Sequence, residues 1–366
     1  MKALLIPLFL STSVALGAAK PTELKPAPTL PASEAINDDM KTRIGDGLSL
    51  APVLGYDPTY GVLLGAAFFR GDTKPPINNL DLFLYGTFQS AFALETKFSY
   101  WNREDRFYRL ETTASSFYDA YFGEGNATVP SAKIKIDAIK IEINPSVWFR
   151  RTRQLSFGLL SEFRYRNETG VNGVKGVTVF GDDFTPIAGV GVQYDLRDHQ
   201  VDTKQGQFYQ AKLDFSPAAL STRARAETFV RLDLEARHFW KTTESLVLAT
   251  QLGAGTSAGE PGYQFRYNLG GSRKLRGYQQ NRLRGCHYYM VQGEARLSVL
   301  SWFSVVGFGG LGDVAQKNIG DFGSPKLTSG LGFRLGLPPD FIAKVRVDIG
   351  ISRDETSFYL NFNEAF

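Results

Sequence analysis

The chain has 366 residues, a single cysteine and a formal net charge of +4 at pH 7. One cysteine excludes an intrachain disulfide, and so small a net charge gives no indication of a nucleic-acid partner. Aromatic residues (28 Phe, 16 Tyr and 4 Trp) and 37 glycines are abundant, although the mean hydropathy is only −0.18. This combination is typical of a membrane β-barrel, because only alternate residues of its strands face lipid.

Residues 1–19 read as a secretory signal peptide, with Lys2 as the charged start and cleavage after Gly17 or Ala19. The alternative is a membrane anchor, but the apolar run is too short to span a bilayer. Residues 20–46 are rich in Pro, Ala, Thr and acids, and predict a disordered periplasmic linker. Cys286 is far from this region, so we interpret it as a small apolar filler rather than a lipid-attachment site.

From about residue 47 the pattern has period two. In residues 229–239, Leu232 and Leu234 lie on one face, and Arg231, Asp233 and Glu235 lie on the other. A soluble β-sandwich would also alternate in this way. The predicted strands, however, run for roughly 10 to 14 residues, which suits a tilted strand crossing a bilayer, whereas soluble strands average about five or six.

The sequence predicts an all-β, antiparallel transmembrane β-barrel of about 16 strands over residues 47–366. Short turns alternate with long loops, as in outer-membrane barrels, and an even strand count places both ends on the periplasmic side. The apolar faces should point to lipid, the charged faces should line the lumen, and aromatic residues near strand ends should form interfacial belts. We expect the strands to begin near residues 47, 59, 79, 92, 105, 137, 154, 184, 205, 224, 243, 286, 302, 326, 341 and 356. The expected belt residues are Trp101, Phe107, Tyr108, Trp148, Phe149, Phe239, Trp240, Trp302 and Phe303.

A basic segment, "NLGGSRKLRGYQQNRLRG", occupies residues 268–285 between two predicted strands. Six cations and no acid lie between Arg266 and Arg284, and four glycines interrupt the segment itself. Two interpretations remain open. The segment is either a loop folded into the lumen or a solvated surface loop that meets anionic lipopolysaccharide.

Several blocks together resemble the BamA/TamA superfamily of outer-membrane barrels, also called bacterial surface antigens. "LGGSRKLRGYQQNRL" is similar to the loop-six signature of that family, and "YDLRDHQVDTKQGQFYQ" is similar to its Asp-x-Arg-Asp block. "PVLGYDPTYGVLLGAAFF", "YFGEGN" and the final strands, from "GLGFRLGLPPDFIAKVRVDIGIS" to "FYLNFNEAF", also resemble the family. The resemblance covers residues 47–366. Within that superfamily, the chain resembles the short members that lack POTRA domains.

The resemblance implies that loop six folds back into the barrel and is held there by an arginine. The implied motif residues are Leu275, Arg276, Gly277 and Tyr278, and the candidate lumenal partners are Glu294, Asp348 and Arg334. The family commonly has an aspartate where this chain has Gly310, so the partner of Arg276 is expected to be Glu294 or Asp348, or to be missing. Asp313 is near in sequence, but its parity places it on the opposite face.

The sequence offers no catalytic constellation. The three histidines have no metal-ligand spacing, and no nucleophile elbow or phosphate-binding glycine loop is present, so we expect no enzyme activity, metal or cofactor. Phe366 ends an alternating aromatic pattern that resembles the C-terminal signal by which barrels are recognised for insertion. The alternative is a last strand that happens to end in an aromatic residue.

The leading functional hypothesis is a factor that assists the insertion or translocation of proteins or lipids at the bacterial outer membrane. The alternatives are a passive porin-like channel, with the cations of the loop selecting anions, and a structural surface antigen. The expected partners are outer-membrane lipids, lipopolysaccharide and client outer-membrane proteins. A homo-oligomer is left open, and a nucleic acid is not expected.

Overall fold

The computed structural model describes residues 47–71, 77–88, 91–103, 105–199, 202–223, 226–323, 325–336, 344–362 and 364–366. The predicted signal peptide (1–19) and linker (20–46) lie outside the described residues.

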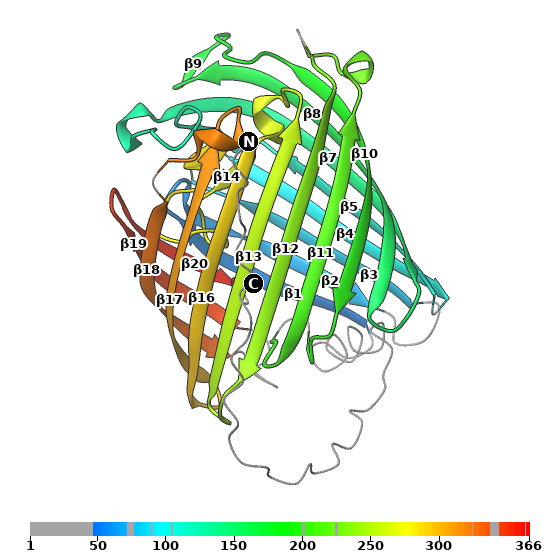
Figure 1. Ribbon diagram of the computed structural model, residues 1–366, viewed down its shortest axis with the longest axis vertical. Coiled ribbons are helices and arrows are strands. Elements are labelled where there is room, and N and C mark those ends of the chain that lie inside the picture. Colours follow the sequence, from blue (N-terminus) through cyan, green and yellow to red (C-terminus); the bar gives the residue numbers. More distant parts are fainter. Residues whose placement is uncertain are drawn as a thin grey trace, which may run out of the picture. The chain divides into compact units, whose positions relative to one another are not determined.

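In the described part of the chain, sixteen antiparallel strands pair in sequence order, and the last strand pairs with the first to close a barrel (Figure 1). The predicted fold and strand number are confirmed, and each expected strand start lies within about five residues of an observed one. The strands are β1 Gly47–Asp57, β2 Gly61–Gly71, β3 Ile77–Gly86, β4 Phe92–Arg103, β5 Arg106–Ser115, β7 Ile134–Arg150, β8 Leu155–Val171, β10 Asp183–Asp195, β11 Gly206–Ser216, β12 Phe229–Lys241, β13 Leu246–Ala258, β16 His287–Leu300, β17 Phe303–Ala315, β18 Lys326–Gly336, β19 Lys344–Ser352 and β20 Thr356–Phe362.

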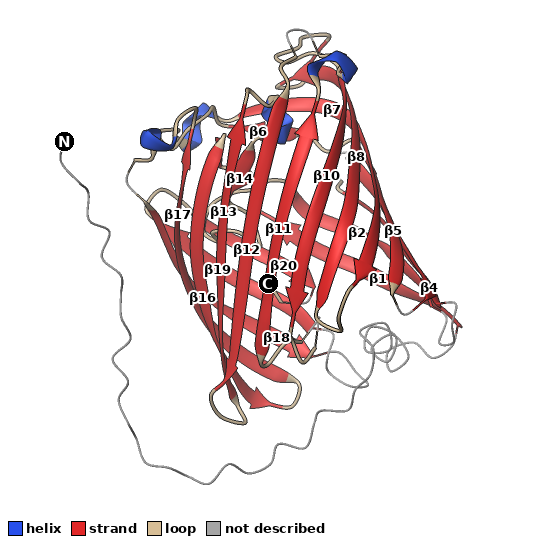
Figure 2. Cartoon of the chain, turned by 45° about the vertical axis from the view of Figure 1, so that its right-hand side comes forward, coloured by secondary structure: helices blue, strands red, loops and turns tan. Residues whose placement is uncertain are grey.

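Short elements decorate the end of the barrel that carries the long loops. β6 (Asp119–Tyr121) pairs with β7, β9 (Val174–Lys175) pairs with β8, and β14 (Tyr267–Leu269) pairs with β15 (Leu283–Gly285). Single 3-10 turns lie in the same loops, where Figure 2 shows them at one end of the strands. They are η1 Pro130–Ala132, η2 Ala218–Leu220, η3 Tyr263–Phe265 and η4 Ile319–Asp321. In the described part of the chain, no helix has the length and apolar character needed to cross a membrane.

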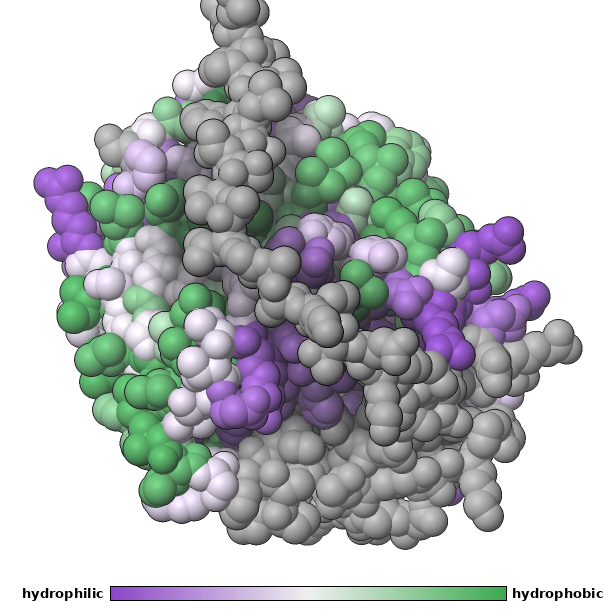
Figure 3. Space-filling model, turned by 60° about the horizontal axis from the view of Figure 1, so that its bottom comes forward, coloured by the Kyte–Doolittle hydropathy of each residue, from purple (hydrophilic) through white to green (hydrophobic). Residues whose placement is uncertain are grey.

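The period-two pattern separates an apolar outer face from a charged inner face. Leu234 on β12 and Ile351 on β19 are 43% and 52% exposed on the outside. On the inside, Arg346 and Asp348 of β19 are almost completely buried. The distribution of side chains is therefore the reverse of that in a soluble protein, as lipid requires: apolar side chains face outward and charged side chains are enclosed. Figure 3, which brings the short-turn end forward, shows hydrophobic residues on the sides of the barrel and hydrophilic residues gathered near its middle.

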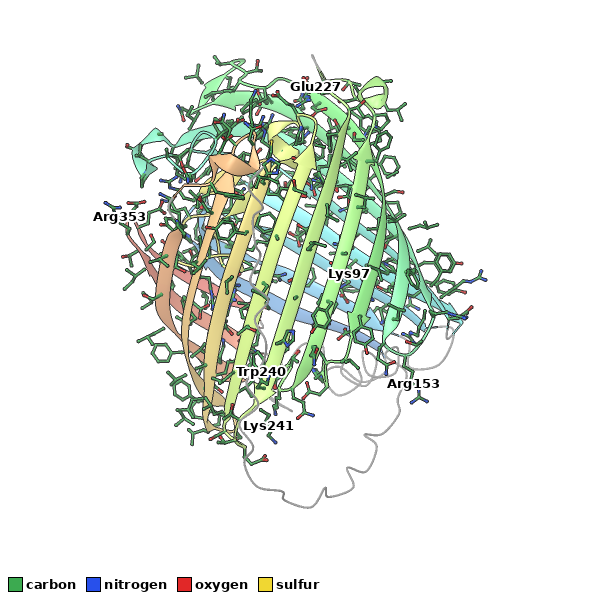
Figure 4. The ribbon with its side chains drawn as sticks, in the orientation of Figure 1. Lys97, Arg153, Glu227, Trp240, Lys241 and Arg353 are labelled. Atoms are coloured by element: carbon green, nitrogen blue, oxygen red, sulfur yellow. The ribbon has the colours of Figure 1, made fainter. Side chains whose placement is uncertain are left out.

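The belt prediction is wrong for three aromatic residues. Phe107, Trp148 and Phe239 are buried inside the barrel, and the rings of Phe107 and Trp148 stack 6.0 Å apart. Strand parity gives the reason, because Phe239 shares its face with Arg237 whereas its neighbour Trp240 points outward. Trp240 and Trp302 are 48% and 47% exposed, and Figure 4 shows Trp240 near the short-turn end. The side chain of Trp101 lies outside the described residues.

Candidate functional site: loop six and the inner wall

Loop six (residues 259–286) joins β13 to β16 and contains the small hairpin of β14 and β15. Between these strands the backbone turns sharply. Gly270 and Gly271 have φ of 107° and 108°, where a side chain would be strained. The amide of Gly270 donates to the carbonyl of Lys274 (3.1 Å), and the amide of Gly271 donates to the carbonyl of Tyr278 (2.9 Å). These bonds hold residues 272–278 as a compact tip.

Arg276 carries the tip onto the inner wall. Its Nη1 lies 2.8 Å from Asp348 Oδ2, and its Nη2 forms an ion pair with Glu294. The guanidinium carbon sits 3.7 Å from the centre of the Phe308 ring. The side chain of Arg276 is 1% exposed and those of both carboxylates are fully buried. The planar, permanently charged guanidinium presents two separate nitrogens, one to each carboxylate, a geometry that the single ammonium nitrogen of lysine does not match.

The two carboxylates belong to a larger buried cluster, here called the arginine network. Arg334 binds Asp348 Oδ1 at 2.6 Å, and Arg296 binds Glu294 Oε2 at 2.7 Å. Charges buried this deeply are tolerated only when each one has opposite charges beside it. The ion pairs of the network join β16, β18, β19 and the tip of loop six, so the network holds these strands and the loop together. Its members are Arg276, Arg296, Arg334, Arg346, Glu294, Asp348 and Glu364.

Gly277 and Tyr278 fasten the tip to β20. The amide of Gly277 donates to Tyr359 Oη (3.1 Å), and the Tyr359 hydroxyl donates to the carbonyl of Tyr278 (2.6 Å). Gly277 has φ of 123°, and a Cβ there would lie 3.0 Å from the backbone of Ile351. No residue other than glycine fits this position without displacing the tip from the wall.

Gln292 occupies the space left by Gly310. The two residues are opposite each other on β16 and β17, and a Cβ at Gly310 would lie 2.9 Å from the Cβ of Gln292. The amide of Gln292 accepts from the Leu275 backbone (3.1 Å) and donates to the Arg273 carbonyl (2.7 Å). Asp313 takes no part, because its carboxylate accepts from Asn126 and from the Gly323 amide outside this cluster.

Beyond the tip, loop six reaches both sides of the place where β20 meets β1. Arg282 binds Glu355, in the turn between β19 and β20, at 2.7 Å. The Gln279 amide donates to the same carboxylate (3.0 Å), and the Gln280 amide donates to Thr59 Oγ1, in the turn between β1 and β2, at 3.2 Å. Loop six therefore joins the outer ends of the first and last strands.

Apolar packing supports these polar contacts. A buried cluster combines side chains of the loop with side chains of the wall, so the tip also gains hydrophobic stabilisation. Its members are Leu269, Leu275, Tyr278, Leu283, Tyr288, Met290 and Val314.

The structure brings the predicted motif (Leu275, Arg276, Gly277 and Tyr278) together with Glu294 and Asp348. Arg334 touches Asp348 but carries the same charge as Arg276, so it supports the site through the shared carboxylate. Phe366 lies elsewhere, inside the barrel against Phe239. Sequence reasoning missed Gln292 and Tyr359. Period two places Gln292 on the face of Glu294, but it does not tell which groups of that face loop six contacts.

Part of the lumen beside loop six is open. One cavity of about 410 Å³ is lined by Arg109, Lys212, Arg231 and Lys274 together with four acids. A second, of about 360 Å³, lies next to it, and both are lined by Arg164. Loop six thus fills the β16–β20 side of the lumen. On the other side of the barrel, β4 contributes Lys97, which Figure 4 shows near the middle of the barrel.

Two further candidate features are the Cys286 thiol and the side chains that could bind a metal ion. Cys286 is buried, and burial raises the pKa of its thiol, which disfavours the thiolate. Among the described residues, no group of three or more His, Cys, Asp or Glu side chains is placed to hold a metal ion.

The fold and the site together define a transmembrane-type β-barrel whose loop six, the sixth connection at its end of the barrel, lies inside the lumen. Comparison with known proteins places it in a family. The Omp85 superfamily domain matches residues 82–363, so the chain belongs to the Omp85 superfamily, as the resemblance of its motifs indicated. No curated protein matches the sequence.

Solved structures share the fold at low identity. BamA from Haemophilus ducreyi lacking POTRA domains 1-3 has a TM-score of 0.61 and 11% identity, with 87% of this chain and 70% of that chain covered. CdiB from Escherichia coli has a TM-score of 0.62 and 11% identity, with 86% of this chain and 62% of that chain covered. CdiB from Acinetobacter baumannii has a TM-score of 0.57 and 13% identity, with 86% of this chain and 59% of that chain covered. The chain spans less than two thirds of either CdiB chain.

Proposed function

We propose that this chain is a non-enzymatic factor of the bacterial outer membrane that assists the insertion or translocation of client proteins through a lateral opening. Membership of the Omp85 superfamily and the resemblance to its assembly and secretion barrels support the proposal. The site adds support, because Arg276 holds the tip of loop six against the inner wall through two buried ion pairs.

The observation that carries the proposal is the seam, the junction of β20 with β1. β20 registers with β19 over seven residue pairs, from Val345↔Phe362 to Ile351↔Thr356. On its other side, within the described residues, it registers with β1 through the single pair Tyr56↔Leu360. β1 in turn registers with β2 over all eleven of its residues.

A weakly paired seam provides the physical means for lateral opening. Each missing ladder bond leaves an amide or a carbonyl without its strand partner, and such an edge is a template for another strand. An incoming client strand can pair there before it reaches the lipid, so its polar backbone is never left unpaired in hydrocarbon. Outer-membrane lipids and lipopolysaccharide surround the barrel in this proposal, and client outer-membrane proteins are its transient partners.

Locking the seam tests the proposal. With Cys286→Ser as background, Tyr56→Cys and Leu360→Cys place two thiols on the register pair, and oxidation closes the seam. The matched control joins Leu234→Cys to Ala254→Cys, a register pair of β12 and β13 on the same outer face. In proteoliposomes, the locked seam should slow the folding of an outer-membrane client, and reduction should restore the rate. Equal rates for locked and reduced protein would contradict an assembly role through the seam.

The cavities beside loop six favour a passive channel as the second candidate. Their charged lining suits water and small ions, and Lys274 of the tip lines one of them. Conductance in planar bilayers, before and after deletion of residues 268–285, tests this function. A wide, anion-selective pore in the intact chain supports a channel. A large rise in conductance only after the deletion indicates that the loop is a plug.

A further inference from the structure

We infer that the short-turn end of the lumen contains a recognition site for peptide segments of the form acidic–small–aromatic, which the chain occupies with its own residues 364–366. These residues, here called the tail segment, are Glu364, Ala365 and Phe366. The site shares Arg296 and Arg334 with the arginine network but lies apart from the seam, and the inference does not depend on the proposed assembly role.

An acid pocket receives Glu364. Its Oε2 lies 2.7 Å from Arg334 Nε and 3.8 Å from Arg296 Nε, and its Oε1 lies 3.3 Å from Lys344 Nζ. The Glu364 side chain is 4% exposed. Burial alone would raise its pKa, but the three cations hold the pKa well below its usual range, so the carboxylate stays charged. Three cations from β16, β18 and β19 thus converge on one carboxylate.

An aromatic pocket next to it receives Phe366. The Phe366 ring packs against Phe239 of β12, at 6.4 Å between ring centres, and against Ala249 of β13. The guanidinium of Arg296 covers both rings, 5.6 Å from Phe366 and 5.7 Å from Phe239. Arg296 Nη2 also donates to the backbone oxygen of Phe366 (3.0 Å). Arg296 therefore contacts the acid, the ring and the backbone of the tail segment.

The tail segment has left the path of its own strand to reach these pockets. One-to-one continuation of the register Tyr56↔Leu360 would place residue 364 opposite residue 52 of β1. That residue is Pro52, which has no amide hydrogen to donate to a partner strand. The tail segment instead crosses the lumen to β12 and β13, and in Figures 1 and 2 the label of the C-terminal end lies within the barrel outline. The tail segment thus either docks in the two pockets or extends β20 along β1, and Pro52 of β1 disfavours the extension.

The pockets lie close to the short-turn rim, where a segment of another chain can reach them. Phe239 is two residues from the end of β12, Arg334 is two residues from the end of β18, and Lys344 begins β19. Lys344 also binds Asp202, in the turn between β10 and β11, at 2.6 Å. A second segment with an acid two residues before an aromatic ring offers the same contacts, so it should exchange with the tail segment rather than bind beside it.

Competition between the tail segment and a synthetic peptide tests the site in the full chain. In a Cys286→Ser background, Ala249→Cys and Ala365→Cys place thiols on two alanines of the same buried cluster. The probe is an amidated peptide that ends in Asn-Glu-Ala-Phe, so that recognition does not depend on a terminal carboxylate. The control peptide ends in Asn-Gln-Ala-Ala. Heat-modified migration in gels verifies that each variant is folded.

We expect the two cysteines to cross-link readily, and excess probe peptide to slow the reaction while the control peptide leaves it unchanged. A second measurement uses the labelled probe on the variant that combines Glu364→Gln with Phe366→Ala. Loss of the resident segment should tighten probe binding at least about tenfold, equivalent to ~1.4 kcal/mol. Arg296→Ala in that variant should abolish the gain. Absence of the cross-link, equal slowing by both peptides, or unchanged probe binding would overturn the inference.

Discussion

Replacement of Arg276 by alanine removes the group that joins the tip of loop six to β16 and β19. Two buried ion pairs and the contact with the Phe308 ring are lost together. Breaking a buried pair from one side costs ~3–5 kcal/mol when the partner is left without a counter-charge. Here Glu294 keeps Arg296 at 2.7 Å and Asp348 keeps Arg334 at 2.6 Å, so neither carboxylate is isolated. The expected cost therefore lies at the lower end, ~3 kcal/mol, or about a hundredfold shift in loop docking.

Limited proteolysis measures this shift, because trypsin cleaves after the lysine and arginines of the loop only when the tip leaves the wall. Arg276→Ala should be cleaved in loop six far faster than the parent, and its single-channel conductance should rise. Arg276→Lys should be intermediate, since lysine keeps the charge but loses the two-nitrogen fork that faces Glu294 and Asp348. Arg353→Ala is the matched control, because Arg353 is exposed in the turn after β19 (Figure 4). Cleavage and conductance equal to those of the parent would refute the anchoring role.

Three further changes probe the same region. Gly277→Ala should release the tip as Arg276→Ala does, because the added Cβ meets the Ile351 backbone, whereas Gly307→Ala, with open space around its Cβ, should leave tryptic cleavage unchanged. Tyr359→Phe removes a hydroxyl that makes two buried hydrogen bonds and should cost ~1–3 kcal/mol, seen as a lower unfolding midpoint; an unaltered midpoint contradicts this. The pKa of Glu364 is lower in the folded state than in the unfolded state. Its charged carboxylate therefore stabilises the fold fully at pH values above the unfolded-state pKa, and this stabilisation is lost as the pH falls through the folded-state pKa. The unfolding temperatures of the parent and Glu364→Gln should accordingly differ by a constant amount from about pH 8 to about pH 5.5 and converge only in stronger acid.

The strands and their inner faces could be predicted because lipid imposes a strict rule on them. A membrane barrel allows only one orientation of β12, with Leu232 and Leu234 facing lipid and the charged side chains facing the lumen. The structure adopts this orientation for Arg231, Asp233 and Glu235. Aromatic residues near strand ends are less constrained, since a ring is stable both at the interface and inside a lumen. Phe107 and Phe239 were therefore assigned to the wrong side, although their parity with Arg109 and Arg237 contained the answer.

The contacts of loop six could be predicted only in part. The resemblance indicated Arg276 and offered Glu294 and Asp348 as partners, because both share the inner parity. It could not indicate Gln292, Tyr359 or Glu355, since no local pattern tells which of many lumenal polar groups a distant loop will reach. The docking of Glu364 and Phe366 was also beyond the sequence, because an aromatic pattern continuing past β20 is equally consistent with an extended strand.

The tip of loop six and the tail segment share one buried network, and this predicts how their substitutions combine. Among the described residues, the network has four arginines and three carboxylates, a net charge of +1. Arg276→Ala lowers that charge to zero and Glu364→Gln raises it to +2, where the remaining guanidinium groups repel one another. The double variant returns to +1. Its loss of stability should thus be smaller than the sum of the two single losses, whereas separated sites are additive within ~0.3–0.5 kcal/mol. Unfolding midpoints of the parent, both single variants and the double variant form the cycle, and strict additivity would show that the loop and the tail segment are held independently.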